Sequence, residues 1–276
     1  MINTITATHR LARPYSRLAA SYDAALGISN FIGTRTAFET LVNHYGIAFR
    51  SAADIGCGTG LFACYLRQCW GVPVFAVDRS SEMLAVAANN CPNPNVCFLQ
   101  QDIRCLRLPC PVDLITANFD TMNHLLTGLD LKRSFRRIRE NLRPGGHFIF
   151  DLITPCQPLR VGQTHIRRLG PASCPSVQRI RWNPWQRMLL ISVILRSLSS
   201  TVPKVEVHRE RAYSPVEVGR WLMDAGFVIR GMHDAVTLRM AAGCPPRIIV
   251  IARRKTGRRQ RDIRCSRAND HVIQPD

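Results

Sequence analysis

Short apolar runs alternate along this chain with segments in which apolar residues recur every three or four positions. A run of four or five apolar residues predicts a buried strand, and the recurrence predicts a helix that buries one face. Strands that alternate with helices form an open, mostly parallel sheet with helices on both faces. The pattern therefore predicts an α/β fold. The first strand is expected to end at Asp54, and another is expected to begin at 227–229. The others are expected to cover 74–77, 96–99, 113–116, 147–151 and 247–252.

Capping residues predict where two of the helices begin and one ends. Ser80 stands in the N-cap position of the helix after the second predicted strand. Ser214, Pro215 and Glu217 form a second helix start, with an N-cap serine, proline in the first turn and a capping-box glutamate. Gly226 is placed to end that helix.

The stretch between the first predicted strand and its helix is rich in glycine. Asp54 ends the strand, and Gly56, Gly58 and Gly60 follow at alternate positions. A strand, a glycine turn and a helix form the nucleotide-binding crossing of an open sheet. The spacing is Gly-x-Gly-x-Gly, whereas a dinucleotide fingerprint is Gly-x-Gly-x-x-Gly. A carboxylate at Asp54 would repel a pyrophosphate and suit a cationic ligand, such as S-adenosylmethionine (SAM), which carries an ammonium and a sulfonium.

Two further acidic residues follow the next predicted strands. Asp78 ends the second strand, at the position where an adenosine ribose presents its hydroxyls, and a carboxylate can accept both hydroxyl protons. Asp102 comes shortly after the third strand and could accept a proton from the adenine amino group.

With these motifs in order, the chain resembles the class I SAM-dependent methyltransferases. The matching stretches are 54–60, 77–78, 101–102, 113–115 and the Leu-Arg-Pro-Gly-Gly stop signal at 142–146, and the resemblance covers about residues 15–253. It implies a Rossmann-like, doubly wound seven-stranded sheet with an antiparallel last strand, and SAM as cofactor. It also implies that Asp54 contacts the methionyl end of SAM, Asp78 the ribose and Asp102 the adenine amine. The expected cofactor-binding residues are Asp54, Gly56, Cys57, Gly58, Gly60, Asp78, Arg79, Met83, Asp102, Ile103 and Asn118.

The turn after the fourth strand holds the candidate catalytic residues. Residues 118–125 resemble the equivalent turn of bacterial amino-sugar N-methyltransferases, which also carry a histidine there, but differ from them at Asp120. A hydroxyl acceptor needs a general base, whereas a neutral amine needs little help. We take His124 and Asp120 as candidate catalytic residues and Asn123 as a candidate substrate contact. The alternative for His124 is a side chain that caps or lines the next helix.

The domain organisation follows from the segments around this core. Residues 1–46 are expected to form a helical cap, in which Tyr22 either contacts the substrate as part of a lid or only buries area. Residues 47–253 form the methyltransferase domain, with a substrate-side insertion at about 155–213. In that insertion 155–176 reads as loop, followed by strands over 177–182, 188–195 and 204–213, where Glu206 and His208 alternate with valines. These strands either roof the acceptor pocket or only extend the fold or a dimer contact.

Charge and apolar content limit the possible partners. The chain has 276 residues and a formal net charge of +18. Residues 254–276 form a basic tail that we expect to be disordered. Such a tail either binds RNA or anionic lipid, or only adds solubility. No apolar run reaches the roughly 18 residues of a membrane span, and no secretory signal is evident, so a cytoplasmic protein is expected.

The cysteines argue against a metal site. There are 11, an odd number, and no Cys-x-x-Cys occurs. A disulfide framework and a metal centre are both poorly supported, and buried free thiols are expected.

Three functions remain open at this point. The first is transfer of a methyl group from SAM to an N or O atom of a small-molecule acceptor by in-line displacement. The second is methylation of tRNA or rRNA through the basic surface, although no recognisable RNA-binding module precedes the glycine loop. The third is SAM binding without catalysis. The identity of the acceptor and the oligomeric state, with a homodimer as one option, cannot be read from the sequence.

Overall fold

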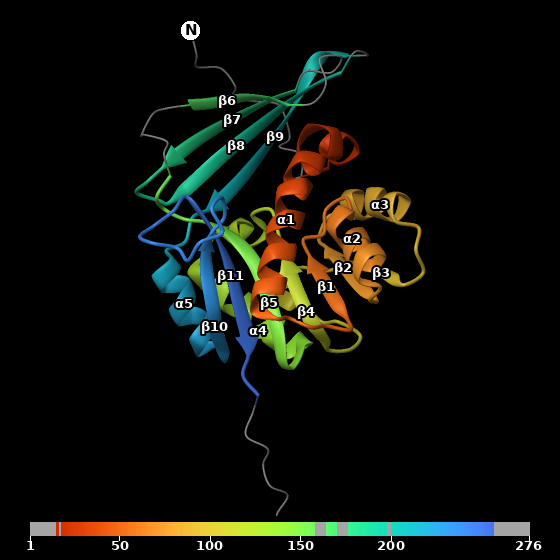
Figure 1. The fold of residues 1–276 in the computed structure, drawn as a ribbon. Helices are drawn as coiled ribbons and strands as arrows, with labels where there is room; N and C mark the ends of the chain where they lie inside the picture. Colours follow the sequence, from red (N-terminus) through yellow and green to blue (C-terminus); the bar gives the residue numbers. More distant parts are fainter. Residues whose placement is uncertain (1–14, 17, 158–163, 170–175, 198–199, 257–276) are drawn as a thin grey trace, which may run out of the picture.

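The computed structural model of the chain describes residues 15–16, 18–157, 164–169, 176–197 and 200–256. Seven strands form a central sheet in the order β10-β11-β5-β4-β1-β2-β3 (Figure 1). The strands are β1 (Ala52–Ile55), β2 (Val74–Asp78), β3 (Val96–Gln100), β4 (Val112–Ala117), β5 (Leu142–Ile153), β10 (Phe227–Asp234) and β11 (Arg247–Arg254). The strands β1 to β5 pair in parallel, and β11 is antiparallel to both β5 and β10. The predicted doubly wound sheet with an antiparallel last strand is confirmed.

In the described part of the chain, five α-helices cover the two faces of this sheet. They are α1 (Ile28–Tyr45), α2 (Leu61–Trp70), α3 (Ser81–Asn90), α4 (Gly128–Asn141) and α5 (Pro215–Asp224). Alternate residues of the strands face opposite ways, so that Phe148 and Phe150 of β5 pack in a core with α4 and α5, and Ile149 packs in a core with α1 and α2. The predicted caps are present: Ser80 accepts a hydrogen bond from the Met83 amide, and Glu217 accepts one from the Ser214 amide.

The glycine pair at the start of β5 lies inside the strand and not in a preceding turn. The strand begins at Leu142, five residues before the predicted start at His147. The pairing of β5 with β4 shifts register between Leu142 and His147, and Gly145 has a φ of 83°. The stop signal in the sequence therefore produces a bulge, which is a usual site for a glycine in a strand.

A second sheet, which is antiparallel, lies beyond one end of the central sheet. This is the end at which β5 finishes and β11 begins (Figure 1). Its strands are β6 (Thr164–Leu169), β7 (Ser176–Asn183), β8 (Met188–Ser197) and β9 (Ser200–Arg211). Three of them match the predicted insertion strands. The fourth, β6, lies in the segment that was predicted to be loop, and it pairs along its whole length with β7.

The segment before α1 crosses between the two sheets. It contains the short helices η1 (Ala19–Ser21) and η2 (Asp23–Gly27), the second of them a π-helix. Leu18 is buried against Ile153, Trp182 and Ile191, so the segment shares a small core with the second sheet. This placement brings Tyr15 and Tyr22 to the carboxyl ends of the central strands. Residues 257–276, most of the basic tail, lie outside the described residues.

Candidate functional site

The glycine loop between β1 and α2 folds tightly against the end of β2. The backbone N–H of Gly56 donates to the Val77 carbonyl at 2.7 Å. Gly56 has a φ of 68°, and a side chain there would collide with Thr121. Gly60 has a φ of 83° and caps α2, and a Cβ there would lie 2.9 Å from the Cβ of Ala87. Glycine is required at both positions by the left-handed backbone and by the close neighbour.

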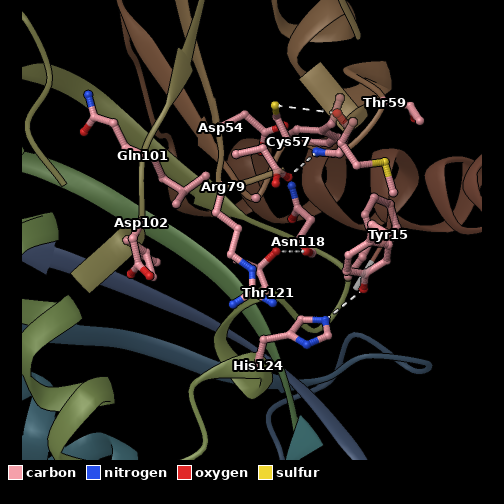
Figure 2. A pocket seen from close by; sticks show the side chains of 18 of the residues that line it. Tyr15, Asp54, Cys57, Thr59, Arg79, Gln101, Asp102, Asn118, Thr121 and His124 are labelled. Carbon is pink, nitrogen blue, oxygen red and sulfur yellow. Dashed lines mark hydrogen bonds between the residues drawn. The ribbon is translucent and has the colours of Figure 1, made fainter. Parts of the chain in front are cut away.

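The loop forms one wall of a cavity of about 310 Å³ at the carboxyl ends of β1, β2 and β4 (Figure 2). Ten of the 11 predicted cofactor-binding residues line this first cavity, and Gly60 does not. Gly60 instead faces α3, which explains its requirement for glycine without any ligand. The cavity is also lined by residues that were not predicted to bind the cofactor, among them Thr59, Thr121, Leu125 and Leu126.

Asp54 is buried at the base of the first cavity, with an exposed fraction of 2%. Its carboxylate accepts a hydrogen bond of 2.8 Å from the hydroxyl of Thr116 on β4. Burial raises the pKa of Asp54 to about 7, and the hydrogen bond from Thr116 only partly opposes that rise. A cation placed in the cavity would favour the ionised carboxylate and lower its pKa again.

Asp78 holds the glycine loop in place. Its Oδ2 accepts from the Gly58 amide at 2.9 Å, and its Oδ1 accepts from the Ser80 amide at 2.9 Å. Burial nevertheless raises the pKa of Asp78. A carboxylate offers about four acceptor sites, so about two remain for further donors in the cavity.

Asp102 is paired within its own turn, η3 (Ile103–Cys105). Its oxygens accept from the backbone N–H of Arg104 at 2.8 Å and from the guanidinium of the same residue at 2.7 Å and 2.9 Å. The Arg104 hydrogen bond is the main reason why the pKa of Asp102 is lowered. The carboxylate is therefore ionised and fixed in direction at the edge of the cavity.

His124 ends the short helix η4 (Thr121–His124). Its ring lines the first cavity and points toward the hydroxyl of Tyr15 (Figure 2). The Tyr15 hydroxyl and His124 Nε2 lie 2.9 Å apart, and Nε2 is 3.7 Å from Oε1 of Glu210. Burial is the main cause that lowers the pKa of His124 to about 4. The imidazole is thus neutral near neutral pH and has a ring nitrogen that can accept a proton.

The other two candidates in this turn are placed differently. Asp120 points away from the first cavity and forms a salt bridge with Arg247 of β11, at 2.6 Å. Asn123 is fully buried, and its amide donates to the carbonyls of Ile153 and Arg211. Asn123 lines neither the first cavity nor the second cavity described below, and its side chain joins β5 to the end of β9. Its contact with substrate stays a prediction.

A second cavity, of about 290 Å³, lies between the N-terminal segment and the second sheet. Tyr15, Tyr22 and Phe119 line both cavities, so the two are neighbours. Apolar and polar residues contribute about equally to the remaining wall. Its apolar residues are Leu18, Leu26, Ile153, Ile180, Leu189, Ile191, Val193 and Pro246, and its ionisable residues besides the two tyrosines are Asp120, His208, Glu210 and Arg247.

Three ionisable residues of β9 were not predicted to belong to a site. Glu206, His208 and Glu210 are at most 4% exposed, while the residues between them are half-buried (Val207) or exposed (Arg209). Glu206 accepts hydrogen bonds of 3.0 Å from the backbone N–H groups of Tyr15 and Leu18. The alternation in the sequence indicated a half-buried strand, but only the structure shows that its polar face is the buried one. The signal in the sequence that could have indicated a site was the presence of three ionisable residues at alternate positions of one strand.

One pair of cysteines is joined, contrary to the expectation of free thiols. Cys156, just after β5, forms a disulfide with Cys244 in the β10–β11 connection. Seven cysteines among the described residues are free, and four of these are exposed: Cys69, Cys97, Cys105 and Cys110. In the same described part of the chain, no group of three or more His, Cys, Asp or Glu side chains could hold a metal ion. No helix there is both long and apolar enough to cross a membrane.

Comparisons with known proteins agree with this geometry. Residues 52–146 match the family described as "Methyltransferase domain". A protein of Geobacillus sp. (strain WCH70) classed as a methyltransferase is 24% identical over 250 residues, which cover 87% of this chain and 99% of the relative.

Solved structures show the same fold. A SAM-dependent methyltransferase from Clostridium acetobutylicum ATCC 824 has a TM-score of 0.72 at 23% identity, covering 88% of this chain and all of that one. The sugar N-methyltransferase KedS8 from Streptoalloteichus sp. ATCC 53650 also has a TM-score of 0.72, at 16% identity. The match covers 91% of this chain and 98% of the KedS8 chain. Residues 52–146, which include the glycine loop, thus match a methyltransferase domain, and the chain has the fold of the SAM-dependent methyltransferases.

Proposed function

We propose that the protein transfers a methyl group from SAM, bound in the first cavity, to an N or O atom of a small molecule bound in the second cavity. The observation that carries this proposal is the shared wall of the two cavities, formed by Tyr15, Tyr22 and Phe119. Because the cavities share these residues, a methyl donor in one would lie next to an acceptor in the other. Methyl transfer depends mainly on how the donor and the acceptor are aligned.

The polar groups of the first cavity match the parts of SAM. The buried carboxylate of Asp54 suits the methionyl ammonium, which would restore its ionised form. The two unused acceptor sites of Asp78 match the two ribose hydroxyls in number. Asp102 is left for the adenine amine, although its oxygens are already shared with Arg104. In this arrangement the glycines allow the cofactor to lie against the backbone of the loop.

The residues at the junction would align the acceptor and exclude water. The segment that carries Tyr15 and Tyr22 acts as the lid, since it is the part of the chain that lies between the two cavities. Burial raises the pKa of both tyrosines, so their hydroxyls stay protonated and donate hydrogen bonds. His124, neutral and in contact with Tyr15, is placed to accept a proton from a hydroxyl or an amine. Water is kept out by the apolar side of the second cavity.

A small acceptor is favoured over a nucleic acid by the size and cover of the second cavity. Its volume of about 290 Å³ is at the lower end of small-molecule sites, and the second sheet roofs it. KedS8, one of the similar structures, is a sugar N-methyltransferase. The basic tail, on which the nucleic-acid alternative depends, lies outside the described residues.

The test is to block the second cavity alone. Ile180→Trp places a large ring in that cavity, and Ile166→Trp adds the same ring at a position that is 59% exposed. With isotopically labelled SAM and a panel of amine and hydroxyl acceptors, we expect Ile180→Trp to raise the acceptor KM at least about tenfold, about 1.4 kcal/mol, and to leave the Kd for SAM unchanged. Ile166→Trp should behave as wild type. Equal effects of the two variants on KM, or SAM binding without turnover of any acceptor, would refute the proposal.

A further inference from the structure

Glu210 of β9 is a buried carboxylate that the fold leaves only partly paired. It is 4% exposed and lines the second cavity. Its Oε2 has no hydrogen-bond partner among the described residues, and its Oε1 lies 3.7 Å from His124 Nε2. A buried oxygen without a partner is costly, so a carboxylate in this state indicates a donor that is present only when a ligand is bound.

His208, two positions earlier on the same face of β9, is in a similar state. It is 3% exposed, it lines the same cavity, and its Nδ1 lacks a hydrogen-bond partner in the described part of the chain. Its Nε2 faces Glu206 at 3.4 Å, and its ring lies 4.5 Å from that of Tyr15. The unused groups on this side of the cavity are therefore a carboxylate oxygen and an imidazole nitrogen, next to the wall that the two cavities share.

The charges around the second cavity have an excess of acid. Arg247 is the cation of the lining, and it is already paired with Asp120 at 2.9 Å and with Asp151. Glu210 adds a further carboxylate, and the lining supplies no second guanidinium or ammonium for it among the described residues. Such an excess of negative charge favours a bound cation, and the effect is larger where the site excludes water. The pKa of Glu210 is raised, mainly by burial and next by the charge of Asp120.

We propose, building on the function proposed above, that the methyl acceptor is an amine carried on a compact apolar framework, and that Glu210 binds it as an ammonium and takes one proton from it. His208 Nδ1 is a second acceptor for the ammonium hydrogens. The apolar side of the cavity, with Ile180, Leu189 and Ile191, holds the framework.

The step balances without any further reactant. The ammonium gives one proton to the Glu210 carboxylate and becomes a neutral amine with a free lone pair. That lone pair attacks the methyl carbon of SAM, the N–C bond forms as the C–S bond breaks, and the sulfur keeps the electron pair. The products are a methylated ammonium and S-adenosylhomocysteine (SAH), and Glu210 later loses its proton to solvent.

The experiment compares two probes of nearly equal shape, cyclohexylamine and cyclohexanol, on the SAH-loaded full-length protein near neutral pH. We expect the amine to bind at least about tenfold more tightly than the alcohol. That preference should be lost in Glu210→Gln, which keeps the shape but not the charge. Glu140→Gln, at an exposed glutamate on α4, is the matched control and should keep the preference.

The outcomes separate this inference from the function on which it rests. If the amine shows no advantage over the alcohol in the wild type, including no detectable binding of either probe, the amine proposal is overturned whether or not Glu210→Gln folds. If both probes bind equally and Ile180→Trp displaces both, the second cavity still takes the acceptor but does not select amines. If the preference for the amine survives in a folded Glu210→Gln, Glu210 is not the recognition residue.

Discussion

If the ammonium of SAM lies beside the buried carboxylate of Asp54, as proposed, cofactor binding depends on pH in a direction that can be calculated. In the free protein its pKa is about 7, raised by burial. An ammonium beside it requires the ionised form, so any protonated Asp54 must lose its proton when the cofactor binds. At about pH 7 roughly half of the molecules are ionised, and at about pH 5.5 roughly 3% are. The Kd for SAH, which carries the same ammonium as SAM, should therefore be about 15-fold larger at the lower pH.

The assay is titration calorimetry with SAH in buffers of different ionisation enthalpy, which reports both the Kd and the protons released. We expect close to one proton released per SAH at the lower pH. The ammonium of SAH stays protonated in this range, because α-amino groups titrate near or above about 7.7, and His124 is already neutral there. Asp54→Asn is the control and should show weaker binding with little dependence on pH. A Kd that does not change with pH in the wild type, or an equal slope in Asp54→Asn, would refute the reasoning; in the second case the slope belongs to another group, with Asp78 the first candidate.

Three further outcomes are expected. Asp78→Ala should weaken SAH binding at least about tenfold, because one hydrogen bond to a charged group is worth about 1.5–3 kcal/mol; unchanged affinity in calorimetry would remove the ribose assignment. His124→Ala should lower kcat by about 100-fold with little change in the Kd for SAM, and equal losses in both would indicate a structural role. Replacing Cys156 and Cys244 by serine should lower the free energy of unfolding in urea by about 2–4 kcal/mol, and reductant should do the same to the wild type but not to the variant; a wild type that ignores reductant would contradict this.

The centre of the main sheet could be predicted from the sequence because strands such as β1 and β4 bury both faces and read as apolar runs. The same rule failed for β6, in a segment rich in Pro, Gly, Ser and Arg that was assigned to loop. This strand pairs with β7 alone at the edge of the second sheet, so it needs no apolar run on either face. The bulge at the start of β5 was missed for a related reason, because a glycine with positive φ marks a bulge as well as a turn.

The candidate cofactor residues could be placed from the sequence because parallel strands bring their carboxyl ends to one edge. Asp54 and Asp78 each stand at such an end, and both line the first cavity. The second cavity could not be placed in the same way. Alternation along β9 gives two faces but does not say which one is buried. Glu206, His208 and Glu210 are buried on the face of the second sheet against which the N-terminal segment packs.

The N-terminal segment is held at both of its ends. Glu206 accepts the backbone N–H groups of Tyr15 and Leu18 on the side of the second sheet, and Asp23 accepts the hydroxyl of Thr59 from the glycine loop. A wall held in this way cannot shift toward one cavity without changing the other. The affinities for cofactor and acceptor are then linked, and linkage is reciprocal. By whatever factor bound SAH changes the affinity for the acceptor, the acceptor must change the affinity for SAH by the same factor.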